Sequence, residues 1–369
     1  MRVACAAPAC HAVRLIAAGF PTFNKYPMPM RNTPQPNKTG SKNQTRRAAP
    51  IVLAAAAGLL AGCAGIQSAL DPQGPQAQAI ANISWAMFWG AAFILLLVMA
   101  LALYAFLRPA GASAPAANLW IGIGGLAFPA VVLSALLVYG THAMGNLRAQ
   151  AGATPEIEVV AHRWWWEVNY LGPGGALIAS ANEIRIPAGR PVVVSLRSQD
   201  VIHSLWVPNL AGKMDLVPGR SNRIVLHADR PGMYRGQCAE FCGAQHARMA
   251  LHVVAQTPEE HTAWLAAQRM PAGEPNSRLA KRGRKMFATY CMVCHSVRGH
   301  SSATQPGPDL THVAGRNFLA AGTLYNNRDN MMALITHSQD IKPGSGMPSH
   351  PYLDENALHA LVEYLEGLK

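Results

Sequence analysis

Acidic residues are absent from the first 62 positions of this sequence, although the same segment holds eight Lys and Arg residues. The whole chain has 31 Lys and Arg against 19 Asp and Glu, and a formal net charge of +12. Setting the first 62 positions aside leaves 23 basic residues against the same 19 acidic ones. The positive charge is therefore concentrated in one terminal segment, which argues against a nucleic-acid-binding surface, and no nucleic-acid partner is expected.

Charge is also missing from residues 48–59, an apolar run that follows Arg46-Arg47 and precedes Leu60-Ala61-Gly62-Cys63. A charged segment, an apolar segment and small residues in this order are typical of a signal peptide. The last four residues resemble the lipobox of bacterial lipoproteins, in which the cysteine is lipidated and becomes the mature N-terminus. We therefore expect residues 1–62 to be a leader and Cys63 to be lipidated. An ordinary signal peptide and an uncleaved membrane segment are the alternatives.

Two longer runs, residues 83–107 and 119–139, contain no charged residue either. Each exceeds the ~20 residues that span a bilayer as a helix, and their apolarity on all faces disfavours a buried hairpin in a soluble protein. We expect residues 63–150 to hold the lipidated N-terminus and two transmembrane helices joined by residues 108–118. With Cys63 outside, the two spans return the chain to the outer face of the bacterial cytoplasmic (inner) membrane, where the soluble domains are expected.

Cysteine is scarce, with seven residues in 369. The seven are Cys5, Cys10, Cys63, Cys238, Cys242, Cys291 and Cys294. The first three lie in the leader and the lipobox, and the other four form two close pairs, each followed by a histidine. A secreted domain held by disulfides would rarely space its cysteines in this way, so both pairs suit prosthetic groups better.

From about residue 155, short apolar segments alternate with Pro- and Gly-containing turns. The predicted strands are residues 156–162, 182–186, 192–197, 223–227 and 249–254. Such spacing predicts an all-β sandwich or barrel over residues 151–270, which ends in a short helix at 259–268. A Pro/Gly linker at 270–275 is followed by helical periodicity, so residues 276–369 are expected to form an all-α domain.

Potential metal ligands are concentrated in twelve residues that end the β region. They are Cys238, Glu240, Cys242, His246 and Met249, with His203 further upstream. Two thiolates and two imidazoles would suffice for a tetrahedral zinc site. A thioether contributes little to zinc but suits copper, which favours a copper site. A copper-delivery protein with a Cys-x-x-x-Cys pair is a third interpretation.

Residues 80–255 strongly resemble cytochrome c oxidase subunit II. The resemblance rests on the two-helix anchor, Arg163-Trp164-Trp165-Trp166, residues 203–208, residues 215–220 and the loop from Cys238 to Met249. It implies a cupredoxin barrel that holds a binuclear copper A centre of two copper ions. The implied ligands are the thiolates of Cys238 and Cys242, the imidazoles of His203 and His246, the Met249 thioether and the Glu240 backbone carbonyl.

The same resemblance suggests roles for two further side chains. In the family, the carboxylate at Glu240 contacts a magnesium ion at the interface with subunit I, and an ordinary loop carboxylate is the alternative. Trp164 occupies the position at which the family receives electrons from soluble cytochrome c. Core burial is the default for rings in this aromatic run, and Trp164 facing a tethered haem domain is a further possibility.

The second cysteine pair, Cys291-Met-Val-Cys294-His295, is the attachment signature of a c-type haem. A thioredoxin-type redox pair is the main rival, but that motif requires a βαβ context. The second axial ligand should be a Met or His downstream, and Met347, flanked by Gly and Pro, is preferred over other nearby candidates. Those candidates are Met331, Met332 and His337.

Residues 277–369 resemble a class I cytochrome c, with Gly307-Pro308-Asp309-Leu310 after the haem motif and a closing helix around residue 364. The resemblance implies that Cys291 and Cys294 anchor one covalently bound haem c, and that His295 and Met347 ligate its iron. The distal ring nitrogen of His295 is predicted to donate to a backbone carbonyl near residues 306–308.

Together these features predict the electron-entry subunit of a terminal haem–copper oxidase, with a fused cytochrome c domain as in caa3-type oxidases. Electrons would pass from a donor such as a cytochrome c to haem c, to copper A and on to subunit I, which reduces oxygen to water. Subunits I and III are the expected membrane partners. An electron-donor subunit of a nitric oxide reductase and a copper-handling assembly factor remain alternatives.

Overall fold

The computed structural model describes residues 65–109, 117–150, 153–172, 177–300 and 306–369, without the side chains of residues 117, 144 and 146–150. The predicted leader, residues 1–62, and the predicted lipidation site, Cys63, lie outside the described residues.

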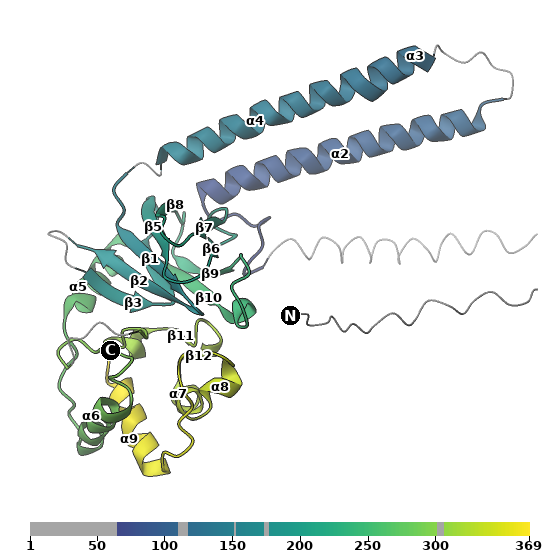
Figure 1. The fold of residues 1–369 in the computed structure, drawn as a ribbon. Coiled ribbons are helices and arrows are strands. Elements are labelled where there is room, and N and C mark those ends of the chain that lie inside the picture. The colour runs from purple at the N-terminus through teal and green to yellow at the C-terminus, as the bar shows by residue number, and fades with distance from the viewer. Residues whose placement is uncertain (1–64, 110–116, 151–152, 173–176, 301–305) are drawn as a thin grey trace, which may run out of the picture. The chain divides into compact units, whose positions relative to one another are not determined.

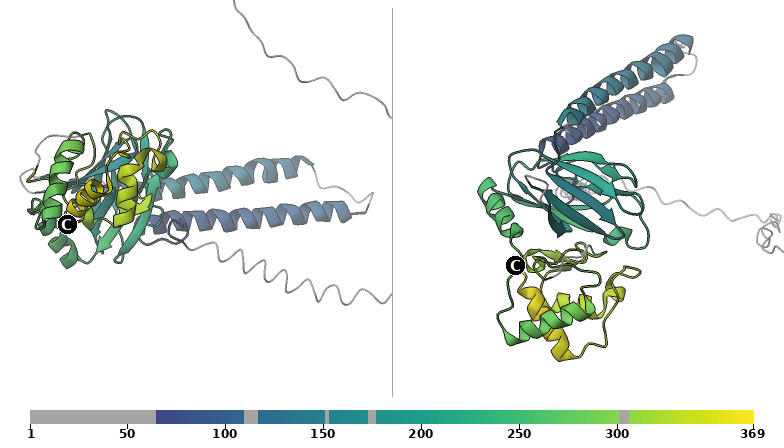
Figure 2. Two further views of the ribbon diagram at one scale, coloured as in Figure 1. Left: turned by 90° about the horizontal axis from the view of Figure 1, so that it is seen from below. Right: turned by 60° about the vertical axis from the view of Figure 1, so that its left-hand side comes forward.

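Two long helical stretches lie side by side in the N-terminal part of the described chain (Figures 1 and 2). They are α2 (Pro75–Leu107), and the continuous series α3 (Ala117–Trp120), η2 (Ile121–Ala127) and α4 (Phe128–Gln150). Within them, Pro75–Leu107 and Asn118–Ala143 are long and apolar enough to cross a membrane, with mean hydropathies of 2.6 and 2.3. The predicted pair of apolar helices is therefore present.

Both helices extend beyond their predicted apolar runs. Helix α2 begins at Pro75, because its first turns belong to the soluble part of the chain: Ala77 and Ala81 are buried, and the Ala77 N–H donates to the Leu210 carbonyl oxygen at 3.3 Å. Polar residues in these turns interrupt the apolar run, so the run alone places the start too late. Helix α4 likewise continues past the apolar run to Gln150.

Ten strands follow. They are β1 (Ile157–His162), β2 (Trp165–Leu171), β3 (Leu177–Ala181), β4 (Glu183–Pro187), β5 (Val192–Ser198), β6 (His203–Trp206), β7 (Met214–Leu216), β8 (Asn222–Leu226), β9 (Gly232–Cys238) and β10 (Ala250–Gln256). All five predicted strands are present, with bounds within two residues. The other five strands were not predicted, because they are very short, begin in the aromatic run or contain glycine and polar residues.

The strands form two five-stranded sheets, in the orders β3-β2-β1-β5-β8 and β4-β10-β9-β6-β7. Neighbouring strands are antiparallel except for the pairs β1–β5 and β10–β4. Alternate side chains of both sheets, such as Val159, Leu196, Ile184 and Leu251, are buried in one common core. The two sheets therefore pack face to face as a β-sandwich, as Figure 2 shows, and the predicted cupredoxin-like β-domain is confirmed.

The C-terminal region is helical, as predicted, except for one short two-stranded sheet. Its elements are α5 (Pro258–Arg269), α6 (Arg278–Tyr290), η5 (Val313–Gly315), β11 (Phe318–Leu319), β12 (Leu324–Tyr325), α7 (Arg328–Thr336), α8 (Ser338–Ile341) and α9 (Glu355–Glu366). Strands β11 and β12 form the short sheet, and α5 is the short helix predicted at the end of the β region. Helices α6 and α9 cross closely at Gly283, where an added Cβ would overlap the Ala360 backbone carbonyl. Phe287 of α6 and Tyr364 of α9 are among the largest fully buried side chains at this crossing.

Candidate metal centre and prosthetic-group pocket

Sulfur and imidazole side chains meet at one end of the β-sandwich. His203 starts β6, Cys238 ends the neighbouring strand β9, and the loop that follows carries Cys242, His246 and Met249. The pairing of Leu205 with Cys238 in the sheet fixes these two strands against each other. His203 and Met249 are fully buried, and both thiols are buried as well. Residues that are separate in sequence are thus brought together by the sheet register.

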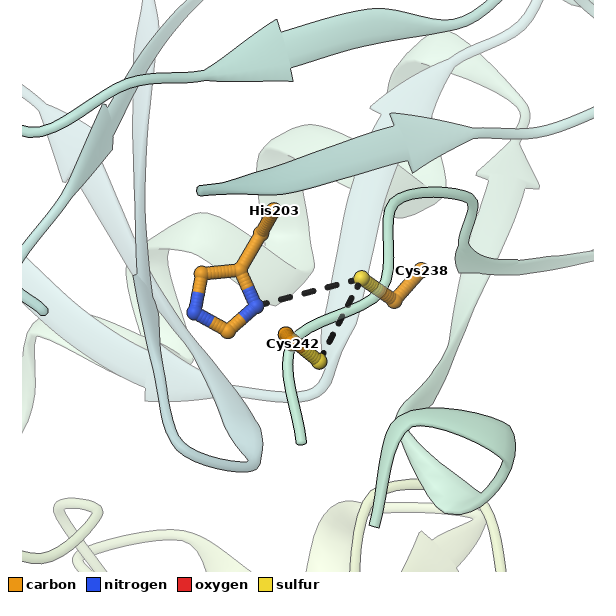
Figure 3. A group of neighbouring side chains, drawn as sticks. All are labelled: His203, Cys238 and Cys242. Atoms are coloured by element: carbon orange, nitrogen blue, oxygen red, sulfur yellow. Dashed lines mark hydrogen bonds between the residues drawn. The ribbon is translucent and has the colours of Figure 1, made fainter. Parts of the chain in front are cut away.

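The donor atoms surround the two thiols at short range. Figure 3 shows the Cys238 Sγ facing the His203 Nδ1 and the Cys242 Sγ, each at 3.8 Å. The Cys242 Sγ also lies 3.7 Å from the His246 Nδ1 and 3.9 Å from the Met249 Sδ. The ligand atoms of His203, Cys238 and Cys242 all lie within 4.8 Å of one another. This spacing is open enough for metal ions to enter between the donors.

The four cysteines among the described residues, Cys238, Cys242, Cys291 and Cys294, are free thiols. Burial, together with the neighbouring Cys238, raises the pKa of the Cys242 thiol to about 12. A thiol in this setting stays protonated unless a cation offsets the charge of the thiolate. The sulfur pair therefore suits a metal ion far better than nucleophilic chemistry.

Asp200 orients the buried histidine of the cluster. Its Oδ1 lies 2.8 Å from the His203 Nε2, and the carboxylate also accepts the backbone N–H groups of Arg163 and Val201. Burial lowers the pKa of His203, although Asp200 opposes this effect. Because Nε2 is engaged by the carboxylate, Nδ1 is the ring nitrogen presented to the sulfur atoms. Sequence reasoning missed Asp200, and its only signal was a carboxylate three residues before a candidate ligand.

Glu240 presents its backbone and its side chain to different surroundings. The carbonyl oxygen lies 3.2 Å from the Cys238 Sγ, within the cluster. The carboxylate is instead 44% exposed and lies 3.6 Å from the Lys213 Nζ. The side chain is therefore available for interactions at the surface.

Trp164 links the sulfur cluster to a second site. Its indole Nε1–H donates to the Cys242 carbonyl oxygen at 2.9 Å, and its ring lies against Gly243. The other side of the residue lines a cavity that also receives Cys294, His295 and Met347. Cys294 and His295 of the predicted haem motif and the predicted second axial ligand, Met347, thus line one cavity, whereas Cys291 is not among its lining residues.

The far side of His295 is held as predicted. Its Nδ1 lies 2.9 Å from the Pro308 carbonyl oxygen, which confirms the expected bond to a backbone carbonyl at residues 306–308. An added Cβ at Gly307 would lie 2.6 Å from the Cys294 carbonyl oxygen and 3.0 Å from the His295 ring, so a side chain there would displace the motif. Burial lowers the pKa of His295, which favours the neutral imidazole that metal binding requires.

The Met347 loop is held by polar contacts to its backbone. The Ser338 Oγ and the Gln339 Nε2 donate to the Met347 carbonyl oxygen at 2.8 and 2.6 Å. Met331 of α7 is buried and lines the same cavity as Met347, whereas Met332 packs against the core of the domain. Cys291 follows α6 as its C-cap residue, and burial raises the pKa of its thiol to about 12.

Two family models match this chain. One, described as "Cytochrome C oxidase subunit II, periplasmic domain", matches residues 167–256, and the other, described as "Cytochrome c", matches residues 280–369. The first match contains the sulfur and imidazole cluster, and the second contains the whole Cys291–His295 motif together with Met347.

Curated relatives give the same result over most of the chain. It is 34% identical over 327 residues to cytochrome c oxidase subunit 2 of Alkalihalophilus pseudofirmus, a match that covers 84% of this chain and 94% of that protein. It is 31% identical over 250 residues to the protein of the same name from Bacillus subtilis, covering 65% and 69%. The crystal structure of the periplasmic domain of subunit II of cytochrome oxidase from Bradyrhizobium japonicum is 28% identical, with a TM-score of 0.29, over 31% of this chain and 91% of that one.

Proposed function

Because this chain belongs to the cytochrome c oxidase subunit II family and carries a C-terminal cytochrome c domain, we propose that it is the electron-entry subunit of a haem–copper terminal oxidase. It would accept electrons at the cytochrome c domain and deliver them, through a copper centre, to the oxygen-reducing site of subunit I. As a member of this family the chain is part of an oxidoreductase that also contains other subunits.

The observation that carries the proposal is the donor set around the two thiols. The side chains of His203, Cys238, Cys242, His246 and Met249, with the Glu240 carbonyl, are proposed to hold two copper ions. A zinc site would use only the two thiols and two imidazoles, whereas the Met249 thioether, 3.9 Å from the Cys242 Sγ, suits copper. When bound, copper ions held by these residues would supply one-electron chemistry with little rearrangement of their surroundings.

The protein shields most of this donor set from solvent, and only His246 and Glu240 are partly exposed. His203 and Met249 are fully buried, and two paired strands fix the positions of His203 and Cys238. Asp200 holds the His203 ring from behind. Such support sets ligand orientation, and the apolar shell excludes the water that would have to reorganise when the charge changes.

In the cytochrome c domain, Cys291 and Cys294 are proposed to form thioether bonds to a haem, with His295 and Met347 as ligands of its iron. The side chains fit this assignment, because Cys294, His295 and Met347 line one cavity and the His295 Nδ1 is already engaged by Pro308. When bound, the haem supplies reversible one-electron chemistry, and a His/Met pair favours a high potential.

Trp164 is the proposed electron-transfer residue between the two sites. Trp164 lines the cavity that also receives Cys294, His295 and Met347, and its indole N–H donates to the backbone of the proposed copper ligand Cys242. One aromatic side chain thus contacts both sites.

The remaining proposals concern partners and location. The outward carboxylate of Glu240 is proposed to bind magnesium at the contact with subunit I. Subunit III is a further proposed partner, and a soluble or membrane-bound cytochrome c is the proposed donor. Two helices able to span a membrane would anchor the chain in the bacterial cytoplasmic membrane, with both soluble domains on its outer face.

Electron paramagnetic resonance on the oxidised full-length protein, combined with metal and haem quantification, tests the proposal. We expect low-spin haem and one unpaired electron shared equally by two copper nuclei. The Cys242→Ser variant should lose the shared signal and keep its haem. A signal from a single isolated copper, or bound zinc in place of copper, would contradict the proposed centre.

A further inference from the structure

A lysine of the cytochrome c domain is buried against the proposed copper domain. Lys342, which follows α8, is only 6% exposed. Its Nζ donates to the carbonyl oxygens of Trp164 at 2.7 Å, Arg248 at 3.2 Å and Ala320 at 3.4 Å. Two of these three acceptors belong to the β-domain, and Arg248 lies in the loop that carries His246 and Met249.

Two side chains of the same loop donate hydrogen bonds to the residues on either side of Lys342. The Arg248 Nη1 donates to the Ile341 carbonyl oxygen at 2.6 Å, and the Gln245 Nε2 donates to the Pro343 carbonyl oxygen at 2.9 Å. Residues 341–343 are therefore held from both directions by the proposed copper loop. They directly precede the loop that presents Met347, so one short segment connects the ligand loops of the two proposed redox sites.

A second group of bonds joins the same two domains beside this contact. The buried carboxylate of Glu183, at the start of β4, accepts the backbone N–H groups of Asn317 and Phe318, the latter at 3.1 Å. The Ala250 N–H donates to the Ala321 carbonyl oxygen at 3.0 Å. These residues all belong to one compact unit, residues 60–369. The hydrogen bonds between the two domains are therefore part of the packing of this compact unit.

Burying an ammonium group is unfavourable unless its hydrogen bonds are satisfied. Burial and the nearby Arg248 charge lower the pKa of Lys342 to about 8, so the group remains protonated at neutral pH. Because most of its acceptors come from the β-domain, Lys342 is satisfied only while the two domains stay together. A lysine in this position therefore stabilises the contact between the domains.

We propose that Lys342 is a positioning residue that locks the cytochrome c domain onto the copper loop, so that this domain occupies the surface at Trp164. The inference rests on the proposed function and deepens it. Lys342 of one domain fixes the Trp164 backbone carbonyl, while Cys242 of the other fixes the indole N–H. The electron-transfer residue is thereby held at both ends, and an external donor must deliver its electrons to the cytochrome c domain.

Hydrogen–deuterium exchange on the full-length protein with both prosthetic groups measures how firmly the cytochrome c domain is held against the copper loop. The Lys342→Met variant keeps the length of the side chain and loses the ammonium group. We expect exchange of the interface amides, in peptides covering residues 245–252 and 315–322, to be about tenfold faster or more. Amides within α6 and the β1–β2 pair should exchange at the wild-type rate. The matched control is Lys281→Met, at an exposed lysine of α6, which should leave every peptide unchanged.

An electron-transfer measurement separates positioning from a general loss of structure. In Lys342→Met, haem-to-copper transfer after rapid photoreduction should be slower and should depend on solvent viscosity, because the domain must first return to its position. Both reduction potentials and both spectra should match the wild type. If Lys342→Met does not fold, Glu183→Gln, which weakens the contact from the β-domain side, should give the same local exchange pattern.

If a folded Lys342→Met variant has wild-type amide exchange and wild-type electron transfer, the positioning role of Lys342 is refuted. Failure of the proposed function is distinguishable, because the wild-type protein itself would then lack haem-to-copper transfer. Transfer in the wild type that is unaffected by Lys342→Met would refute the positioning role alone.

Discussion

The indole Nε1–H of Trp164 donates a 2.9 Å hydrogen bond to the carbonyl oxygen of Cys242, which joins the aromatic run before β2 to the loop after β9. The two residues are 78 positions apart in sequence. This bond sets where the ring lies between the sulfur cluster and the cavity that receives Met347.

Replacing Trp164 by Phe removes this bond and part of the ring. We expect haem-to-copper transfer to slow by about one to two orders of magnitude, because misplacing a reacting group by about 1 Å can cost that much. Copper and haem contents should not change. Flash photolysis on the purified protein measures the rate. Trp264→Phe, at a ring that packs on Tyr170, is the control and should transfer normally. An unaltered rate in Trp164→Phe would remove this residue from the path.

Replacing Asp200 by Asn weakens the support of His203. We expect copper affinity to fall roughly 10–100-fold, the usual effect of losing a carboxylate that orients a metal-binding histidine. Competition with a copper chelator at fixed pH measures the change. Asp229→Asn, at an exposed carboxylate near His227, should bind copper like the wild type. Equal copper retention in both variants would show that Asp200 does not support the ligand.

Replacing Gly283 by Ala tests the crossing of α6 and α9. An added Cβ would overlap the Ala360 carbonyl and lie 2.8 Å from the Tyr364 Cβ, so the two helices must separate. We expect the cytochrome c domain to lose about 1–3 kcal/mol of unfolding free energy. Chemical denaturation followed by haem circular dichroism measures it. Gly273→Ala, in open space, should change stability by less than about 0.5 kcal/mol.

His252 gives the domain contact a pH dependence. Its ring is 2% exposed and stacks on Phe318 of the other domain, with 3.9 Å between ring centroids. Burial, with the positive charge of Arg235, lowers its pKa from 6.5 to about 4. Between about pH 4 and pH 6.5, the protein with its two domains in contact therefore binds fewer protons than the protein with the domains separated. Opening should become easier as pH falls from about 6.5 to 4, by at most about 3 kcal/mol.

Glu183 lies beside His252 in the sheet and acts in the opposite direction. Burial raises the pKa of its carboxyl group, so the closed contact retains a proton there more readily than the open one. The contribution of His252 is therefore measured as the difference in pH dependence between the wild type and His252→Gln. Amide exchange of residues 315–322 as a function of pH should have a steeper acid dependence in the wild type. Identical profiles would exclude His252 as the titrating group.

The donor set around Cys238 and Cys242 was predictable because all of its members except His203 lie within twelve residues, and the motif specifies the chemistry. His295 and its Pro308 contact followed from the same reasoning, since a metal-binding histidine needs a partner for its other nitrogen. The assignments of these residues as ligands remain predictions. The two apolar helices were found from their uncharged runs, and the strands with clear alternation were found from their spacing.

Glu183 and Lys342 were not found, because their hydrogen-bond partners lie in distant parts of the chain. Asp200 was not found, because a carboxylate three residues before a candidate ligand is a weak signal. Lys342 is one basic residue among 31 in the sequence, and only the folded contact shows that its acceptors include Trp164 and Arg248. Strand β6 was missed for a related reason. Its four residues form a strand because β7 and β9 pair with it on both sides.

The reciprocal bonds between residues 341–343 and the loop that holds Gln245 and Arg248 divide one recognition surface between two modules of a single gene product. Neither module can be replaced alone without losing half of that surface. A chimaera that exchanges the cytochrome c module for one from a relative therefore needs compatible residues at Glu183, Gln245 and Arg248. Whether a grafted cytochrome c module is functional should depend more on its fit to these contact residues than on the length of the linker.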